Sequence, residues 1–392
     1  MSDSNPFAGR GFEESEGLLH ETAAREVGYD DFGDPFYLEG LRVLLRAYDR
    51  EAKLNAFGRE AALQNIAEQL KKRLRAEKMW KQDPHILERE IRRPIVILGL
   101  VRTGSTALQY LMGQDPDMQH LQYWLAANPQ QRPPQERWDQ NSDYQASVAE
   151  IDAMYAADPS LKAIHFMTAD GPEECRHLLA QSFTDDSFEV NASIPSFSEW
   201  YEAAHLAPSY RRHKKLIQLI GSTDTRKRWL LKYPVHVRQL AALFEVYPDA
   251  CVVWTHRDPA QVLPSYCSLI AGFRAIHEDG TDPKHMAERQ MELWARGMER
   301  AIEFRKGRDA GQFFDLYFKD FRVDPIGCVK RIYAHFDQEL SAEGERRLLA
   351  WQQDNPQYKH GKHGYSDDIG IGRSKILERF GTYMDYFGMK PE

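Results

Sequence analysis

The sequence predicts an α/β fold in which a mainly parallel sheet is flanked by helices. Short apolar runs recur along the chain, and each of the first three is followed by a segment with helical spacing of its apolar residues. The first run is rich in β-branched residues and is bounded by Pro94 and Gly99, which is typical of a buried strand. Strands that alternate with helices lie parallel in one sheet.

The strands of this sheet are expected at residues 95–98, 229–231, 251–255 and 313–317. Helices follow the first three strands, and two more are expected near 329–336 and 343–352. Between the first two strands lies an insertion, at about 115–228, in which helices and loops predominate. The α/β domain as a whole is predicted to span 91–392.

Residues 1–90 are predicted to form a helical extension that packs on this domain. Apolar residues recur at helical spacing over 36–50 and again over 61–79, where many Lys and Arg lie between them. Such amphipathic helices bury one face, so we expect the extension and the α/β domain to make one structural unit.

Charge and cysteine content exclude several classes of protein. The chain has 392 residues, with 51 Lys and Arg against 59 Asp and Glu, so its formal net charge is −8. This balance argues against a nucleic-acid partner, although a local basic pocket for an anion is compatible with it. The four cysteines lie far apart, which favours a reducing compartment and predicts neither a disulfide framework nor a metal site.

Hydropathy argues against membrane insertion and secretion. No run of 18 apolar residues occurs, so we expect no transmembrane segment. The chain begins Met-Ser-Asp-Ser, with neither a basic start nor an apolar stretch, so we expect no signal peptide and a cytoplasmic location.

The loop after the first strand has the composition of an anion site. Residues 99–106 read Gly-Leu-Val-Arg-Thr-Gly-Ser-Thr, between a strand and a helix. Glycines, hydroxyls and a helix N-terminus together can cradle a phosphate. The candidate anion-binding residues are Arg102, Thr103, Gly104, Ser105 and Thr106. A tight structural turn with an incidental arginine is the alternative.

The same loop disfavours a nucleoside triphosphatase. Its glycine spacing is that of a Walker loop, but Ser105 stands where that motif needs a lysine for the β- and γ-phosphates. The third strand also ends in Thr-His-Arg over 255–257, with no acidic residue to hold Mg²⁺.

A second anion site is expected after the third strand. Arg257 lies at the carboxyl end of that strand, and Ser265 follows eight residues later on the next helix. Ligands of open parallel sheets bind at this edge, where an arginine fork and a hydroxyl suit a phosphate. A kinase is rejected, because Leu263 stands where the catalytic loop needs asparagine and no Asp-Phe-Gly triplet occurs.

The loop and the Arg257/Ser265 pair together resemble the two donor-binding signatures of the sulfotransferase family, which uses 3′-phosphoadenosine 5′-phosphosulfate. The similarity is closest to a bacterial branch and covers roughly 90–365. It continues through further segments at 169–175, 231–236, 248–250, 255–259 and 355–357. The resemblance implies a P-loop NTPase-like fold, with the 5′-phosphosulfate at the loop, the 3′-phosphate at Arg257 and Ser265, and no required metal.

Lys232, at the end of the second strand, corresponds to the lysine that the family places near the leaving oxygen. A general base must take the proton of the acceptor, and His236 is the first candidate because histidine titrates near neutrality. His165 is the second candidate, and Glu174 is a third candidate or a partner for His165. A surface lysine and a helix-capping histidine are the alternative interpretations.

Two positions depart from the pattern of related enzymes. Leu125 lies where several of them carry a glutamate, so any base must come from elsewhere. Ala107 stands where some place a tryptophan, so adenine must stack on another group. In the C-terminal loop, Lys359, Lys362 and His363 could close over the 3′-phosphate, although a solvated basic loop is the favoured interpretation.

The hypothesis is therefore transfer of a sulfuryl group from this donor to a hydroxyl of a small acceptor. Aromatic residues and methionines in the insertion favour an apolar or phenolic acceptor over a polyanionic sugar. The alternatives are an atypical P-loop kinase or triphosphatase and a non-catalytic nucleotide-binding protein. We expect a small-molecule partner, and the sequence leaves a homodimer open.

Overall fold

The computed structural model describes residues 7, 9–159, 161–164, 166–356, 359 and 369–392. Its centre is a five-stranded sheet in the order β2-β3-β1-β4-β5, in which all neighbouring strands run parallel. The strands are β1 Ile95–Gly99, β2 Met118–His120, β3 Arg228–Lys232, β4 Cys251–His256 and β5 Phe313–Tyr317. The predicted fold class is confirmed.

Helices cover both faces of this sheet. Those of the N-terminal region are α1 Glu16–Val27, α2 Tyr37–Arg50 and α3 Ala56–Gln82. Between β1 and β3 lie α4 Ser105–Met112, α5 Tyr123–Ala127, α6 Ser142–Ala157, α7 Leu161–Ile164, α8 Arg176–Leu179, α9 Ser187–Asn191, α10 Pro195–Ala203 and α11 Ala207–Ile220. After β3 come α12 Leu240–Val246, α13 Pro259–His277, α14 Pro283–Lys306, α15 Phe318–Val323, α16 Pro325–His335, α17 Ala342–Asp354, α18 Arg373–Arg379 and α19 Gly381–Tyr386. Short 3₁₀ helices complete the chain at Glu13–Ser15, Pro84–Glu88, Gln135–Gln140, Ala180–Ser182, Pro234–Gln239 and Ala310–Gln312.

The sheet divides the core of the α/β part in two, because successive side chains of a strand point to opposite faces. Val96 and Leu98 of β1 pack with α11, α12 and α14, whereas Ile95 and Ile97 pack with α4 and α16. All five residues of β1 are buried. This explains the continuous apolar run in the sequence, since a central parallel strand meets helices on both sides.

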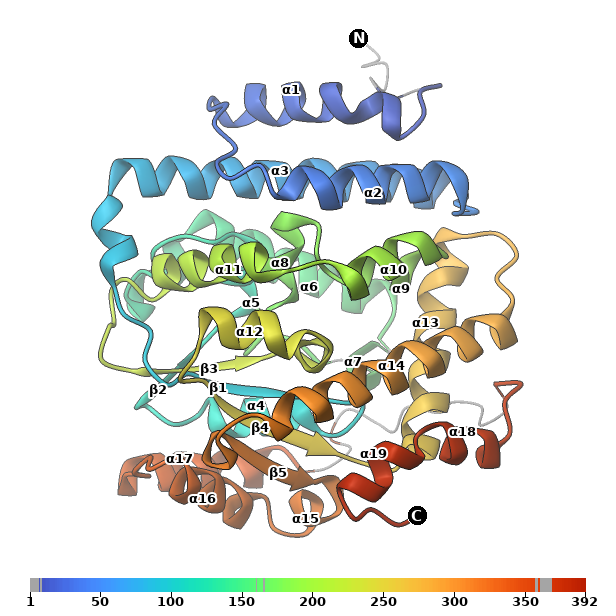
Figure 1. The fold of residues 1–392 in the computed structure, drawn as a ribbon. Coiled ribbons are helices and arrows are strands. Elements are labelled where there is room, and N and C mark those ends of the chain that lie inside the picture. The colour runs from blue at the N-terminus through green and yellow to red at the C-terminus, as the bar shows by residue number, and fades with distance from the viewer. Residues whose placement is uncertain (1–6, 8, 160, 165, 357–358, 360–368) are drawn as a thin grey trace.

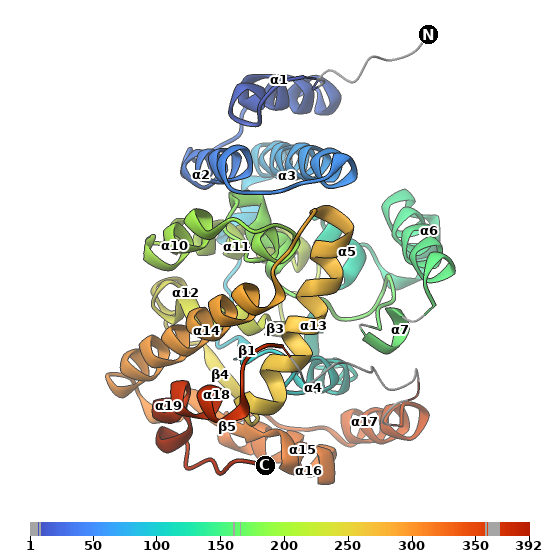
Figure 2. The same cartoon turned by 90° about the vertical axis from the view of Figure 1, so that its right-hand side faces the viewer.

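The N-terminal helices form further layers on one side of the molecule (Figure 1). The pair α2 and α3 lies between α1 and the layer of α10 and α11, and the view in Figure 2 agrees. Leu41 and Leu70 of this region share one apolar cluster with Phe183, Phe188 and Phe197 of the insertion. The extension therefore buries its apolar faces against the insertion, while the domain boundary at residue 90 stays a prediction.

One strand was missing from the sequence-based expectation. β2 lies within the stretch interpreted as helices and loops, pairing Gln119 with Trp229 of β3. It contains three residues, Met-Gln-His, and forms an edge strand of the sheet. So short a run with two polar residues carries too little alternation to indicate a strand.

Gly99 ends β1 with a backbone that other residues avoid. Its φ is +137°, and a Cβ at this position would collide with the carbonyl oxygen of Thr255 on β4. We expect Gly99→Ala to lower the free energy of unfolding by at least about 2 kcal/mol, because strain and steric overlap add. Urea unfolding followed by circular dichroism measures this. Gly272→Ala is the control, since a Cβ there meets no atom within 4 Å; equal stability of the two variants would contradict the expectation.

Candidate active site

A cleft of about 1530 Å³ opens at the carboxyl ends of the strands. This is where a doubly wound sheet binds ligands, because the loops that follow its strands converge there. Predicted site residues from the segments after β1 and β4 line it, namely Arg102, Gly104, Ser105, Thr106, Arg257 and Ser265. The structure thus brings both predicted anion sites into one cavity.

Buried hydrogen bonds of Thr103 fix the conformation of the loop after β1. Arg102 and Gly104 both have left-handed backbones, with φ of 60° and 83°. The hydroxyl of Thr103 is buried, donating to the carbonyl oxygen of Leu100 at 2.7 Å and lying 2.6 Å from the hydroxyl of Thr255. Thr103 therefore shapes the loop, while Ser105 begins α4 and faces the cleft with Thr106.

Direct hydrogen bonds join the two predicted anion sites. Nε of Arg102 donates to the hydroxyl of Ser265 at 3.2 Å, and Arg257 Nη1 donates to the carbonyl oxygen of Arg102 at 3.0 Å. The Arg257 guanidinium lies 4.5 Å from the ring centre of Phe318. Its Nε is buried and has no hydrogen-bond partner among the described residues. A buried N–H of this kind is an incomplete site for an anion.

Lys232 is buried directly behind the cleft wall, in contact with two side chains that line it, Thr106 and Glu174. Its side chain is 1% exposed; Nζ forms an ion pair with Glu174 and donates to the hydroxyl of Thr106 at 3.0 Å. Glu174 lines the cleft. Three segments far apart in sequence therefore meet here: the start of α4, the turn before α8 and the end of β3. A buried lysine needs such a partner, because removal from water penalises its charge.

His236 lies outside the cleft. It is fully buried in the 3₁₀ helix after β3, where Nδ1 lies 2.7 Å from the hydroxyl of Tyr210. Burial, and then the neighbouring His213, lower the pKa of His236 well below its usual value. The ring is held neutral within the core, and this first candidate base is not among the residues that line the cleft.

The other candidates differ in position. His165, Lys362 and His363 lie outside the described residues. Lys359 lines the cleft and donates to Asn355 Oδ1 at 3.0 Å. Leu125 is fully buried in α5 and packs in the core.

The comparisons with known proteins agree with this geometry. Residues 94–342, more than half of the chain, match the sulfotransferase family. The chain belongs to this family. The resemblance inferred from the sequence is thereby confirmed, and the cleft is that of a sulfotransferase fold.

Two solved sulfotransferase structures are similar over nearly the whole chain. Sulfotransferase STF1 from Mycobacterium tuberculosis is 38% identical, with a TM-score of 0.87 over 95% of this chain and 100% of that one. Sulfotransferase STF9 from Mycobacterium avium is 26% identical, with a TM-score of 0.89 over 96% of this chain and 97% of that one. Both similarities extend well beyond the family match, so the N-terminal helices are part of the shared architecture.

A curated relative is similar over a shorter stretch. The omega-hydroxy-beta-dihydromenaquinone-9 sulfotransferase Stf3 of Mycobacterium bovis is 27% identical over 207 residues. The same protein of Mycobacterium tuberculosis matches equally. The chain spans about half the length of these relatives, and the match covers half of this chain.

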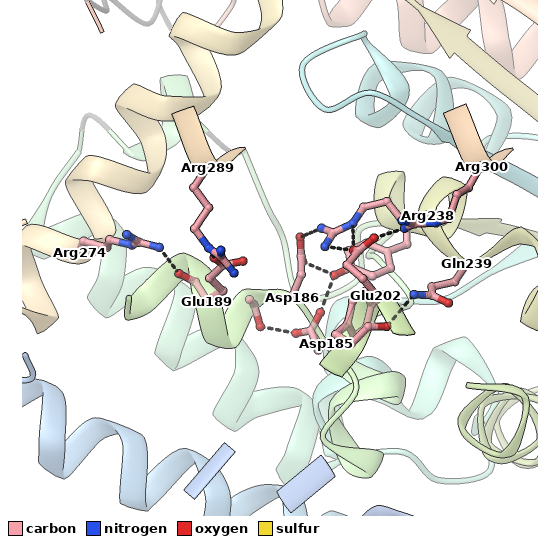
Figure 3. A network of polar contacts seen from close by, with 12 residues as sticks. Asp185, Asp186, Glu189, Glu202, Arg238, Gln239, Arg274, Arg289 and Arg300 are labelled. Atoms are coloured by element: carbon pink, nitrogen blue, oxygen red, sulfur yellow. Dashed lines mark hydrogen bonds and ion pairs between the residues drawn. The ribbon is translucent and has the colours of Figure 1, made fainter. Parts of the chain in front are cut away.

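The sequence did not single out an acidic pair beside Lys232. The hydroxyl of Tyr233, the next residue, bonds to the carboxylates of both Asp185 and Asp186. Burial raises the pKa of Asp186 to about 7, against the lowering effect of Arg238, whose Nη1 lies 3.2 Å from it. Figure 3 shows this network continuing from Arg238 to Glu202. The sequence pattern of two adjacent aspartates does not predict that Asp186 accepts a hydrogen bond from Tyr233, 47 residues away.

The sequence pattern also did not predict Phe318 as a residue of the cleft. Its ring lies against Arg257 and would be 3.0 Å from a Cβ at position 104, so Gly104 leaves room for it. It begins α15, directly after β5. That position was the available signal, because residues that follow a parallel strand reach the ligand edge.

Within the part of the chain that the structure describes, two further features are absent. No three His, Cys, Asp or Glu side chains gather in a way that could hold a metal ion. None of the described helices is both long enough and apolar enough to cross a membrane.

Buried neutral His236 predicts a pH-dependent stability. The unfolded chain takes up a proton at this residue below its usual pKa of 6.5, whereas the folded chain does not, so its contribution to stability is lost as pH falls below 6.5. We expect the stability advantage of the wild type over His236→Asn to shrink by about 2 kcal/mol between pH 7 and pH 5. Urea unfolding at both pH values measures it.

The control is His285→Asn, since this residue is exposed in the structure. Its difference from the wild type should be the same at pH 7 and pH 5. A pH-independent difference for the His236 variant would contradict the assigned burial of a neutral ring.

Proposed function

We propose that this protein transfers a sulfuryl group from 3′-phosphoadenosine 5′-phosphosulfate to a hydroxyl of a small apolar acceptor. The observation that carries the proposal is the pair of linked cations, Arg102 and Arg257, in one cleft, with the buried Lys232 bonded to the lining residues Thr106 and Glu174. A donor with two separated anionic groups needs two such sites. A lysine in contact with the wall of this cavity can then act on the transferred group.

The residues present fit this donor. The 5′-phosphosulfate would bind Arg102, Ser105 and Thr106 at the N-terminus of α4, whose unpaired N–H groups attract anions. The 3′-phosphate would bind Arg257 and Ser265. The buried, unpartnered Nε of Arg257 supports this assignment, because a phosphate oxygen would complete its hydrogen bonding.

The chemistry asks for charge neutralisation and one proton acceptor. The acceptor oxygen forms a bond to sulfur, and the bond between sulfur and the 5′-phosphate oxygen breaks. Lys232 offsets the negative charge that develops on that leaving oxygen. We assign the proton of the acceptor hydroxyl to Glu174, a cleft carboxylate whose orientation is fixed by its ion pair with Lys232. The products are a sulfate ester and adenosine 3′,5′-bisphosphate.

Apolar side chains of the cleft support an apolar acceptor. Val190, Val235, Tyr266, Leu269 and Phe273 line it beyond the phosphate-binding residues. The name of the curated relative states a hydroxylated menaquinone derivative as its acceptor. An acceptor of comparable apolar character is proposed for this chain, without its identity.

The alternatives fit the site less well. A kinase or triphosphatase requires a lysine in the loop, and Ser105 occupies that position. A non-catalytic nucleotide-binding protein has no need of a buried Lys232 paired with a carboxylate in the cleft, a costly arrangement without a function.

Arg257→Ala tests donor binding. Loss of a charge-assisted contact to the 3′-phosphate should weaken adenosine 3′,5′-bisphosphate at least about tenfold. Titration calorimetry measures the dissociation constant. Arg42→Ala on α2, far from the cleft in sequence and 56% exposed, should bind like the wild type. Unchanged affinity in the Arg257 variant would refute the assigned 3′-phosphate site.

Lys232→Met and Glu174→Gln test the chemical step. Each should lower kcat at least about a hundredfold and leave the bisphosphate affinity within about threefold, because each acts on the reacting atoms rather than on the nucleotide. Release of the bisphosphate with the best phenolic acceptor of the wild type reports turnover. Exposed Glu199→Gln on α10 is the control. Wild-type turnover in either cleft variant would remove that residue from the mechanism.

A further inference from the structure

An exposed apolar surface lies at one end of the cleft. Six large apolar side chains are exposed among the described residues. Phe57 on α3 is 60% exposed, while Ile276 and Phe273 on α13 are 53% and 38% exposed. Isolated exposed apolar residues are ordinary, but neighbours at the mouth of a binding cleft mark a contact surface.

One stripe of α13 connects this surface with the donor site. Ser265, Leu269, Phe273 and Ile276 are spaced by four, four and three residues, so their side chains share one face of the helix. The first three line the cleft. At 1.5 Å per residue the stripe is about 16 Å long. It begins at a hydroxyl assigned to the donor and continues with apolar side chains only.

The N-terminal extension completes the stripe. Asn55, at the start of α3, accepts a hydrogen bond from Gly58 at 2.8 Å and donates its backbone N–H to the carbonyl oxygen of His277 at 2.9 Å. A Cβ on Gly58 would collide with that same carbonyl oxygen. This close junction places the Phe57 ring 5.6 Å from the His277 ring, just past Ile276.

We propose that Leu269, Phe273, Ile276 and Phe57 form an apolar shelf that binds an extended hydrocarbon chain of the acceptor. The inference rests on the proposed function and narrows the acceptor class to hydroxyl compounds with a long, unbranched apolar chain. The hydroxyl reacts beside Lys232, and the chain leaves the cleft along α13 toward α3, two elements that adjoin in Figure 1.

The dimensions favour a chain over a protein partner. The shelf consists of single apolar side chains in a row, and its exposed neighbours Ala56, Gly272 and Ala275 are small and uncharged, while exposed Glu60 of α3 borders it. A stable protein interface buries about 800 Å² on each side and places large side chains over a broad patch. A narrow apolar track continuous with the cleft instead matches a linear hydrocarbon.

Chain-length dependence of binding tests the shelf. The probes are 4-alkylphenols from butyl to dodecyl, kept below their aggregation limits, titrated by calorimetry in the presence of saturating adenosine 3′,5′-bisphosphate. For the wild type we expect the affinity to rise about twofold for each methylene beyond the cleft, since one side of the chain is covered. In the double variant Phe57→Ser, Ile276→Ser this rise should stop, with butyl affinity unchanged.

The control is Tyr386→Ser on α19, which removes an apolar side chain that is 42% exposed at a distance from α13 in sequence. It should keep the wild-type rise. The same rise in the double variant, or no rise in the wild type, would overturn the shelf. A further outcome would also overturn the shelf in favour of a membrane contact. This is binding of the wild type to vesicles in the absence of acceptor, if the two substitutions abolish that binding.

The experiment distinguishes an error in the proposed function from an error in the proposed shelf. If the bisphosphate does not bind the wild type, the donor assignment fails. If it binds and chain length has no effect, the donor assignment stands and the shelf is wrong. Thermal unfolding of the double variant verifies its fold, because both substituted side chains are exposed and their removal should leave the core intact.

Discussion

The left-handed turn at Arg102 is the constraint on which the rest of the site depends. A non-glycine residue with φ of 60° is held there at a cost, and the buried Thr103 hydroxyl beneath it holds the loop in place. The turn directs the carbonyl oxygen of Arg102 to the guanidinium of Arg257 and its side chain to Ser265. One backbone conformation therefore sets the spacing of both proposed anion sites, and the proposed donor with its two anionic groups requires such a spacing.

The order of the strands places Lys232, the third cation, next to the loop after β1. β1 lies between β3 and β4, so the loops after these three strands open side by side. The register pairs Ile97 with Lys232 and Gly99 with Thr255, so β3 ends below the turn. Lys232 consequently donates to the hydroxyl of Thr106, at the start of the helix that follows the proposed anion loop. Parallel pairing thus converts three distant segments into one cavity, and no local interaction could do so alone.

The sequence was sufficient where chemistry is local. Pro94 and Gly99 bound a strand whose burial follows from its composition, and the departure at Ser105 already separated the loop from a triphosphate site. It was insufficient where side-chain direction decides. His236 is four residues from Lys232, yet its ring turns into the core against Tyr210, while Glu174 reaches the lysine from another segment. The spacing of apolar residues predicts which side chains share a face of a regular helix. The residues directly after a strand follow no regular period, so their side-chain directions could not be predicted.

The N-terminal helices illustrate the same limit at a larger scale. Amphipathic spacing predicted that 61–79 would pack on a core, and Leu70 does so with Phe183 and Phe188. It did not indicate that the start of α3 would meet the end of α13, because that junction depends on one backbone contact at Gly58. Since α13 begins beside the proposed donor site and ends at this junction, the extension lies where we propose that the acceptor leaves the cleft. On this proposal, a region outside the family match at 94–342 would set the acceptor while the proposed donor site stays unchanged. Relatives with the same donor loop would then differ in acceptor through residues far from the chemistry.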